Sequence, residues 1–160
     1  MSDRTIDIAV TVNGEEVREA VEARKTLVDF LREDLGLTGS HVGCEHGVCG
    51  ACTVRVDGVI VRGCLMLAAQ CDGARVETIE GVSDAGDIAD LQEAFHKRNA
   101  LQCGFCTPGM LLTAQELLQR GGVPSRETIR HYLSGNYCRC TGYQAIVDAV
   151  EAVAEARGTK

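Results

Sequence analysis

The spacing of the cysteines constrains this chain more than any other feature of its sequence. Eight of its nine cysteines fall into two groups of four. The first group is Cys44, Cys49, Cys52 and Cys64, and the second is Cys103, Cys106, Cys138 and Cys140. Four thiolates are enough to hold a metal centre, so the two groups predict two metal sites on one short chain.

The spacing of the first group indicates iron and sulfide. The pattern C-x4-C-x2-C with a later fourth cysteine is that of plant-type [2Fe-2S] ferredoxins. A structural zinc protein is a weaker alternative, because zinc sites usually pair two C-x2-C hairpins, whereas the second group here closes with C-x-C. A Rieske centre would need a C-x-x-H after the Cys44-x-His46 step, and none follows. We therefore expect two [2Fe-2S] clusters.

Composition and charge narrow the class of protein. A chain of 160 residues with 45% hydrophobic residues can hold two small domains, and each cysteine group would bring its own scaffold. The net charge of −7 and the lack of a basic patch argue against nucleic acid as a partner. No apolar run is long enough to span a membrane, and no apolar signal segment follows Met1. These features predict a cytoplasmic protein without structural disulfides.

The N-terminal half alternates apolar and polar residues as strands do. Asn13-Gly14 and Asp57-Gly58 each predict a tight hairpin turn between two such runs. Thr26 and Asp29 resemble a capping box at the start of a helix that ends near Gly36. The expected elements are strands near residues 6–12, 17–21, 53–56, 59–62 and 76–79 and a helix over 27–35. This order predicts a ferredoxin-type β-grasp domain over residues 1–80.

The C-terminal half changes to helical periodicity after a linker-like stretch at residues 81–87. We expect Thr107 to cap a helix with Pro108 in its first position, and Ser125 to cap the next. Thr141 and Gln144 resemble a capping box for the last helix. The four expected helices begin near residues 88, 108, 126 and 144. Together they predict a four-helix bundle over residues 81–160 that holds the second cluster, and an α+β chain as a whole.

Glycines surround the cysteines of the first loop. Gly43, Gly47 and Gly50 lie among its three cysteines. A residue without Cβ adopts positive φ readily, so we expect these glycines to let the loop turn its N–H groups toward sulfur.

Three longer motifs carry a resemblance that covers nearly the whole chain. They are GCEHGVCGACT at 43–53, QCGFCTPGM at 102–110 and GNYCRCTGY at 135–143. All three resemble the iron-sulfur component of the xanthine oxidase family of molybdenum hydroxylases, here on a separate small polypeptide. The resemblance implies a non-catalytic electron-transfer subunit of a molybdenum-containing oxidoreductase. It also implies a large partner subunit with molybdopterin cytosine dinucleotide and a medium partner subunit with FAD, in a heterotrimer that is often doubled.

The resemblance also implies a route for electrons. The helical-domain cluster would lie beside the pterin, and the N-terminal cluster would pass electrons toward FAD or another acceptor. By the same resemblance, Gln102 and the Cys140 sulfur are expected to contact the pterin. Tyr137 departs from the family pattern, which commonly has leucine there.

An independent two-cluster redox carrier or sensor is the alternative function. A freestanding ferredoxin would need residues only to about Ile79, so the helical half favours a subunit that must reach a further cofactor. Cys71 belongs to neither group and is expected to be a small buried side chain.

Overall fold

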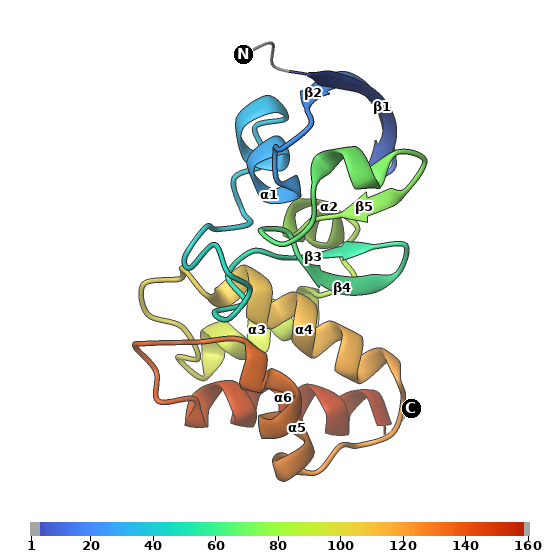
Figure 1. The fold of residues 1–160 in the computed structure, drawn as a ribbon. Coiled ribbons are helices and arrows are strands. Elements are labelled where there is room, and N and C mark those ends of the chain that lie inside the picture. The colour runs from blue at the N-terminus through green and yellow to red at the C-terminus, as the bar shows by residue number, and fades with distance from the viewer. Residues whose placement is uncertain (1–3, 159–160) are drawn as a thin grey trace.

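The computed structural model describes residues 4–158, so the outer limits of the predicted domains, at residues 1 and 160, lie outside the described range. Figure 1 shows a strand-rich N-terminal half stacked on a helical C-terminal half. The α+β fold class predicted from the sequence is confirmed. Within residues 4–158, no helix has the length and apolar character needed to cross a membrane.

A five-stranded mixed sheet forms the N-terminal half. The strands are β1 (Thr5–Val12), β2 (Glu15–Glu22), β3 (Thr53–Val56), β4 (Val59–Arg62) and β5 (Arg75–Glu77). Their order across the sheet is β2-β1-β5-β3-β4, with β1 and β5 parallel and the other neighbours antiparallel. Both predicted hairpin turns are present, because Asn13 and Gly14 have φ of 51° and 88°, and Asp57 and Gly58 have 48° and 84°. These are the paired positive φ values of type I′ turns.

One helical segment covers the sheet. Thr26 caps α1 (Leu27–Asp29) by accepting a hydrogen bond from the Asp29 N–H, and the helix continues as a π-helical turn over Phe30–Asp34. The capping box is incomplete, because the Asp29 carboxylate accepts from the Thr26 hydroxyl instead of from a main-chain N–H. Buried side chains from this helical segment and from one face of the sheet form the core of the N-terminal half. A 3-10 turn over Ala68–Cys71 adds buried side chains to the same core. Cys71 is fully buried there, as expected.

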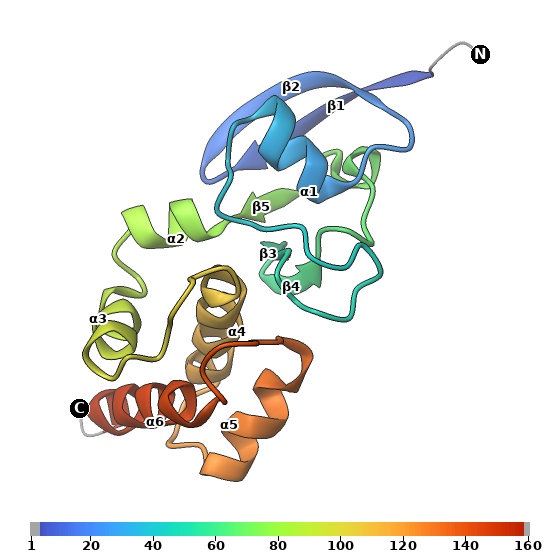
Figure 2. The same cartoon turned by 90° about the vertical axis from the view of Figure 1, so that its left-hand side faces the viewer.

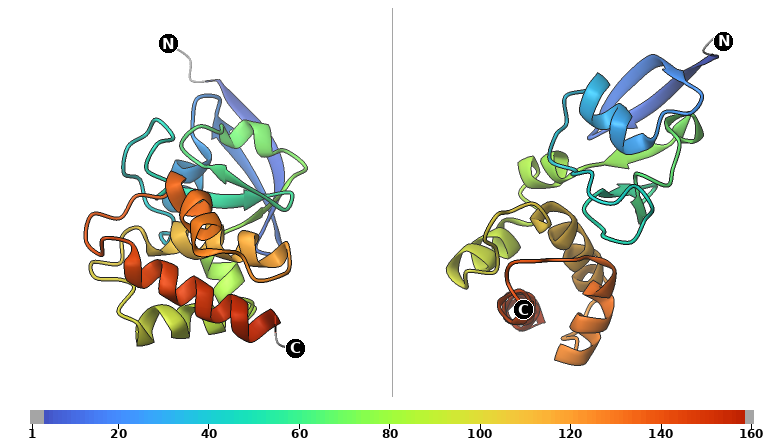
Figure 3. Two further views of the ribbon diagram at one scale, coloured as in Figure 1. Left: turned by 90° about the horizontal axis from the view of Figure 1, so that it is seen from below. Right: turned by 60° about the vertical axis from the view of Figure 1, so that its left-hand side comes forward.

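Within the described residues 79–158, five α-helices follow the sheet. They are α2 (Ile79–Asp84), α3 (Ala89–Lys97), α4 (Thr107–Gln119), α5 (Arg126–Tyr132) and α6 (Gln144–Gly158). The last four are the expected helices, and they pack around one apolar core (Figure 3). The prediction of a linker over 81–87 was wrong in part. Ile79 and Val82 are buried in the helical core, so this segment folds as α2, which lies between the two halves in Figure 2.

Two helix starts differ from the predicted caps. Cys106 occupies the N-cap position of α4, so Thr107 is the first helical residue and Pro108 the second. Thr141 does not form a capping box with Gln144, whose side chain bonds to Arg130 and Asp148 instead. Ser125 caps α5 as expected by accepting from the Thr128 N–H at 3.1 Å.

The two halves are joined through buried polar contacts. Asn136 donates from its side-chain amide to the Gly50 carbonyl at 3.1 Å and to the Thr53 hydroxyl at 3.3 Å. The same amide accepts from the Thr113 hydroxyl of α4 at 3.0 Å. A Cβ on Gly109 of α4 would fall on the Gly50 carbonyl, so only glycine allows this close approach. The loop carrying the first cysteine group therefore lies directly against the helical half.

Candidate metal centres

The first cysteine group is built on one long loop and the hairpin that follows it. Cys44 and Cys49 lie in the loop between the π-helical turn and β3, Cys52 immediately precedes β3, and Cys64 follows β4. Cys52 and Cys64 are buried, whereas Cys44 and Cys49 are half-buried. Pairing of β3 with β4 brings the last two together, with Thr53 opposite Arg62 in the ladder. The hairpin thus delivers the distant fourth cysteine to the site.

The loop turns main-chain N–H groups toward Cys44, as the sequence predicts. The Cys49 N–H lies 3.4 Å from Cys44 Sγ. Hydrogen bonds from the N–H groups of Cys49, His46 and Val48 lower the pKa of the Cys44 thiol to about 6. Burial has the opposite effect on Cys52 and raises its pKa to about 11. The Cys44 thiol is thus prepared to bind metal as a thiolate. The Cys52 thiol loses its proton only when a metal ion takes the place of that proton.

The three predicted loop glycines serve different purposes. Gly47 and Gly50 have φ of 82° and 73°, the conformation that glycine permits. Gly43 does not have positive φ, so that part of the expectation was wrong. A Cβ at Gly43 would lie 3.1 Å from Cys49 Sγ, so this glycine leaves room for a thiol.

The second cysteine group joins two loops of the helical half. Cys103 and Cys106 lie in the loop between α3 and α4, and Cys138 and Cys140 lie in the loop before α6. Cys103 and Cys140 are exposed, Cys106 is half-buried and Cys138 is buried. Figure 1 shows the loops of both groups on the same side of the molecule, and Figure 2 views that side from the front. The structure therefore brings together the residues that the sequence separates by more than thirty positions.

Burial and hydrogen bonds shift the pKa values of two thiols of the second group. Burial raises the pKa of Cys106 to about 12. Burial would also raise the pKa of Cys138, but hydrogen bonds from the Thr141 hydroxyl and from main-chain N–H groups bring it below its usual value. The Thr141 contact was not foreseen, because the sequence suggests a helix cap at that position.

The thiols of both groups lie in pairs. Cys103 Sγ and Cys140 Sγ are 3.6 Å apart, and the thiols of Cys106 and Cys138 form a second contacting pair. In the first group the thiol of Cys44 contacts that of Cys49, and Cys52 contacts Cys64. Two thiolates on one tetrahedral metal, with bonds of about 2.3 Å, are separated by about 3.8 Å. The pairs therefore fit a diiron cluster, which takes two protein ligands on each iron.

The pairing of the thiols also bears on the choice between an iron-sulfur cluster and a single zinc ion. A structural zinc site would gather all four thiolates around one point. Pairs of thiols, each able to take one iron, favour the iron-sulfur interpretation over zinc.

Gln102 and Cys140 lie side by side. The Gln102 side-chain amide donates to the Cys140 carbonyl at 3.0 Å, and both residues are exposed. The structure thus brings the two expected pterin-contacting residues onto one surface. The Gln102 amide has a second N–H and a carbonyl oxygen, which could bind a polar ligand beside this loop.

Each half of the chain matches a known family of iron-sulfur domains. The model described as "2Fe-2S iron-sulfur cluster binding domain" matches residues 10–78, and the model described as "[2Fe-2S] binding domain" matches residues 78–151. The fold and the paired thiols therefore define a two-domain [2Fe-2S] protein.

Curated relatives resemble the chain over nearly its full length. It is 57% identical to the nicotine 6-hydroxylase small subunit of Paenarthrobacter nicotinovorans, over 93% of this chain and 89% of that protein. It is 50% identical to the caffeine dehydrogenase subunit gamma of Pseudomonas sp. (strain CBB1), over 91% and 89% respectively. The chain belongs to the small [2Fe-2S] subunits of the molybdenum hydroxylases of the xanthine oxidase family, and it is an electron-transfer subunit of such an oxidoreductase.

Solved structures agree with this assignment. The chain superimposes with a TM-score of 0.90 on a chain of quinoline 2-oxidoreductase from Pseudomonas putida 86, at 50% identity over 96% of both chains. It also matches the aldehyde oxidoreductase from Desulfovibrio gigas, with a TM-score of 0.86 and 46% identity, over 97% of this chain but only 18% of that one. The same fold therefore occurs both as a separate chain and as part of a longer one.

Proposed function

We propose that this chain relays electrons one at a time from a molybdenum site in a partner subunit to FAD or another acceptor. A [2Fe-2S] cluster supplies the one-electron chemistry when it is bound. We assign one cluster to Cys44, Cys49, Cys52 and Cys64 in a domain over residues 1–80. We assign the other to Cys103, Cys106, Cys138 and Cys140 in a domain over residues 81–160.

One main-chain hydrogen bond carries this proposal. The Tyr137 N–H donates to the Cys49 carbonyl at 2.8 Å. Cys49 belongs to the first site, and Tyr137 immediately precedes Cys138 of the second. A single hydrogen bond therefore connects a ligand of one site with the neighbour of a ligand of the other. Such a connection suits a chain whose two sites must exchange electrons, whereas two independent storage sites would not need it.

The exposure of the two cysteine groups supports a direction of electron transfer from the second site to the first. Cys103 and Cys140 are exposed beside Gln102, whereas every cysteine of the first group is at least half-buried. An exposed thiol edge with a polar amide suits contact with the molybdopterin cytosine dinucleotide of a large subunit. The first site would then face a medium subunit with FAD in a heterotrimer, which could be doubled. We place this complex in the cytoplasm, where thiols remain reduced until they bind iron.

The assembly can be tested by purification from the native host. A tagged form of the full chain should recover a molybdenum-containing chain and a flavin-containing chain in fixed proportion. Recovery of the chain as a lone, cluster-loaded monomer would instead support the alternative, an independent two-cluster carrier or sensor.

The order of the two sites can be tested in the purified complex. Cys106→Ala should remove the helical-domain cluster and abolish the magnetic splitting that a nearby reduced cluster imposes on the Mo(V) signal. Cys52→Ala should remove the other cluster and preserve that splitting. Cys71→Ala is the matched control, because Cys71 is a buried cysteine outside both groups. The proposed order fails if Cys52→Ala abolishes the splitting and Cys106→Ala preserves it.

A further inference from the structure

Thr141 directs a hydroxyl proton at a thiol of the second site. Its Oγ1 lies 3.1 Å from Cys138 Sγ. The Tyr143 N–H donates to the same Oγ1 at 3.2 Å. A hydroxyl has one proton and two acceptor lone pairs. Because an N–H already occupies the acceptor side of Thr141, its own proton is free to point at sulfur.

Tyr143 holds this arrangement in place. Gly142 and Tyr143 have φ of 66° and 70°, and this pair of left-handed residues folds the chain back so that the Tyr143 N–H reaches Thr141. The Tyr143 hydroxyl accepts from the Cys138 N–H at 2.9 Å. The phenol therefore engages the N–H of Cys138 itself, and the Thr141 hydroxyl remains as a side-chain donor at the Cys138 sulfur.

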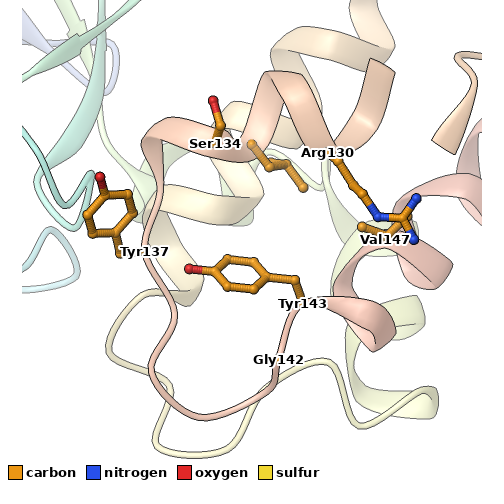
Figure 4. A pocket seen from close by; sticks show the side chains of 7 residues that line it. Arg130, Ser134, Tyr137, Gly142, Tyr143 and Val147 are labelled. Atoms are coloured by element: carbon orange, nitrogen blue, oxygen red, sulfur yellow. The ribbon is translucent and has the colours of Figure 1, made fainter. Parts of the chain in front are cut away.

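The surroundings of Tyr143 are partly open, because the residue is 36% exposed. Its ring lines a pocket of about 390 Å³ whose other walls come from α5, the following 3-10 turn and α6. In Figure 4 the ring lies within the turn formed by residues 137–143, and its hydroxyl points toward the segment that follows Tyr137. A left-handed conformation is rare for a residue with a large side chain and persists only where the structure requires it.

We propose that the Thr141 hydroxyl raises the reduction potential of the helical-domain cluster and that Tyr143 positions this hydroxyl. The inference rests on the proposed function, because it needs a cluster on Cys138. Reduction adds negative charge to the sulfur ligands, so a hydrogen bond to one of them stabilises the reduced form more than the oxidised form. The proton stays on the Thr141 oxygen throughout. Cys138 is only 9% exposed, so water screens the interaction weakly.

The test is a redox titration of the purified complex with dithionite, followed by electron paramagnetic resonance. Thr141→Val keeps the shape of the side chain and removes the hydroxyl, whereas Thr141→Ser keeps the hydroxyl. We expect the reduction potential of the helical-domain cluster to be lower in the valine variant by about 59 mV. For a one-electron couple this shift is a roughly tenfold change in the equilibrium constant for reduction. The serine variant should titrate like the wild type, and the N-terminal cluster should be unchanged in both.

Three other results would contradict the role of the Thr141 hydroxyl or the function on which it rests, and they can be told apart. An unchanged helical-domain potential in a fully iron-loaded valine variant would show that the hydroxyl does not tune the cluster. If Thr141→Val does not bind the helical-domain cluster, Thr141→Ala is titrated in its place. If the valine and alanine variants both lack this cluster and Thr141→Ser retains it, the hydroxyl is required for cluster assembly and does not set the reduction potential. A wild-type complex with no second cluster signal would instead overturn the proposed function.

Discussion

Asn136 has a side chain that bonds to both halves of the chain. It is 1% exposed and bonds to Gly50 and Thr53 of the N-terminal half and to Thr113 of α4. The segment that it anchors includes Tyr137, whose N–H reaches Cys49. A change at this position should therefore affect both stability and the contact between the two sites.

We predict that Asn136→Ala destabilises the cluster-loaded chain by about 1–3 kcal/mol, because it removes the three buried hydrogen bonds that the Asn136 side chain makes. Urea unfolding followed by circular dichroism measures the change. Gln119→Ala is the control, since Gln119 is an exposed polar residue at the end of α4 and should cost less than about 0.5 kcal/mol. Equal effects of the two substitutions would contradict the role given to Asn136.

Residues whose chemistry is unusual are predictable from the sequence, whereas residues whose importance comes from their position in the fold are not. The eight grouped cysteines stand out because thiols at such spacings have few other uses, and Cys71 could be set aside for the same reason. Asn136 carries no such signal, because its partners lie 83 and 86 residues away along the chain. Thr141 was misinterpreted, since the same hydroxyl that can cap a helix can also donate to a sulfur.

At the scale of elements, α4 and α5 are joined by a polar cluster that also reaches β4. The Tyr132 hydroxyl donates to the Glu116 carboxylate and accepts from Arg120 at 2.8 Å. Glu116 also accepts from the Ile60 N–H at 3.4 Å. Burial, together with the bond to Glu116, raises the pKa of Tyr132 from 10.0 to about 12. The folded chain thus favours the neutral phenol.

This shift predicts a loss of stability at high pH. The contribution of Tyr132 is fully present below pH 10.0 and disappears as the pH rises toward about 12, because the unfolded chain then releases a proton that the folded chain retains. Tyr132→Phe should show a smaller decline in the free energy of unfolding across this range. The comparison can be made by urea unfolding at a series of pH values. Equal declines in the variant and the wild type would contradict the prediction.

The elements with local signals were predictable, and the others were not. Asn13-Gly14 and Asp57-Gly58 fixed both hairpins, because these dipeptides accept the positive φ of a tight turn. The helix α2 was missed, because Gly81 and the polar residues after it resemble a linker. Its only signal is the spacing of Ile79 and Val82, which becomes meaningful once the helical core is present to bury them. The π-helical turn after α1 had no signal at all.

At the scale of the whole molecule, two small cores are joined so that their cysteine loops meet on one side. Each half has its own apolar cluster, and the contacts between halves involve main-chain atoms beside the cysteines. Gly109 allows α4 to approach the first loop closely, and the hydrogen bond from the Tyr137 N–H to the Cys49 carbonyl links the two loops. This arrangement suits a relay, in which the two centres must lie near each other.

Metal analysis and spectroscopy of the purified complex decide whether one chain holds two diiron clusters. We predict about four irons and about four acid-labile sulfides per copy of this chain, and two distinguishable paramagnetic signals after reduction. Cys106→Ala should remove one signal and Cys52→Ala the other. A single signal in the wild type, or zinc in place of iron, would contradict the account.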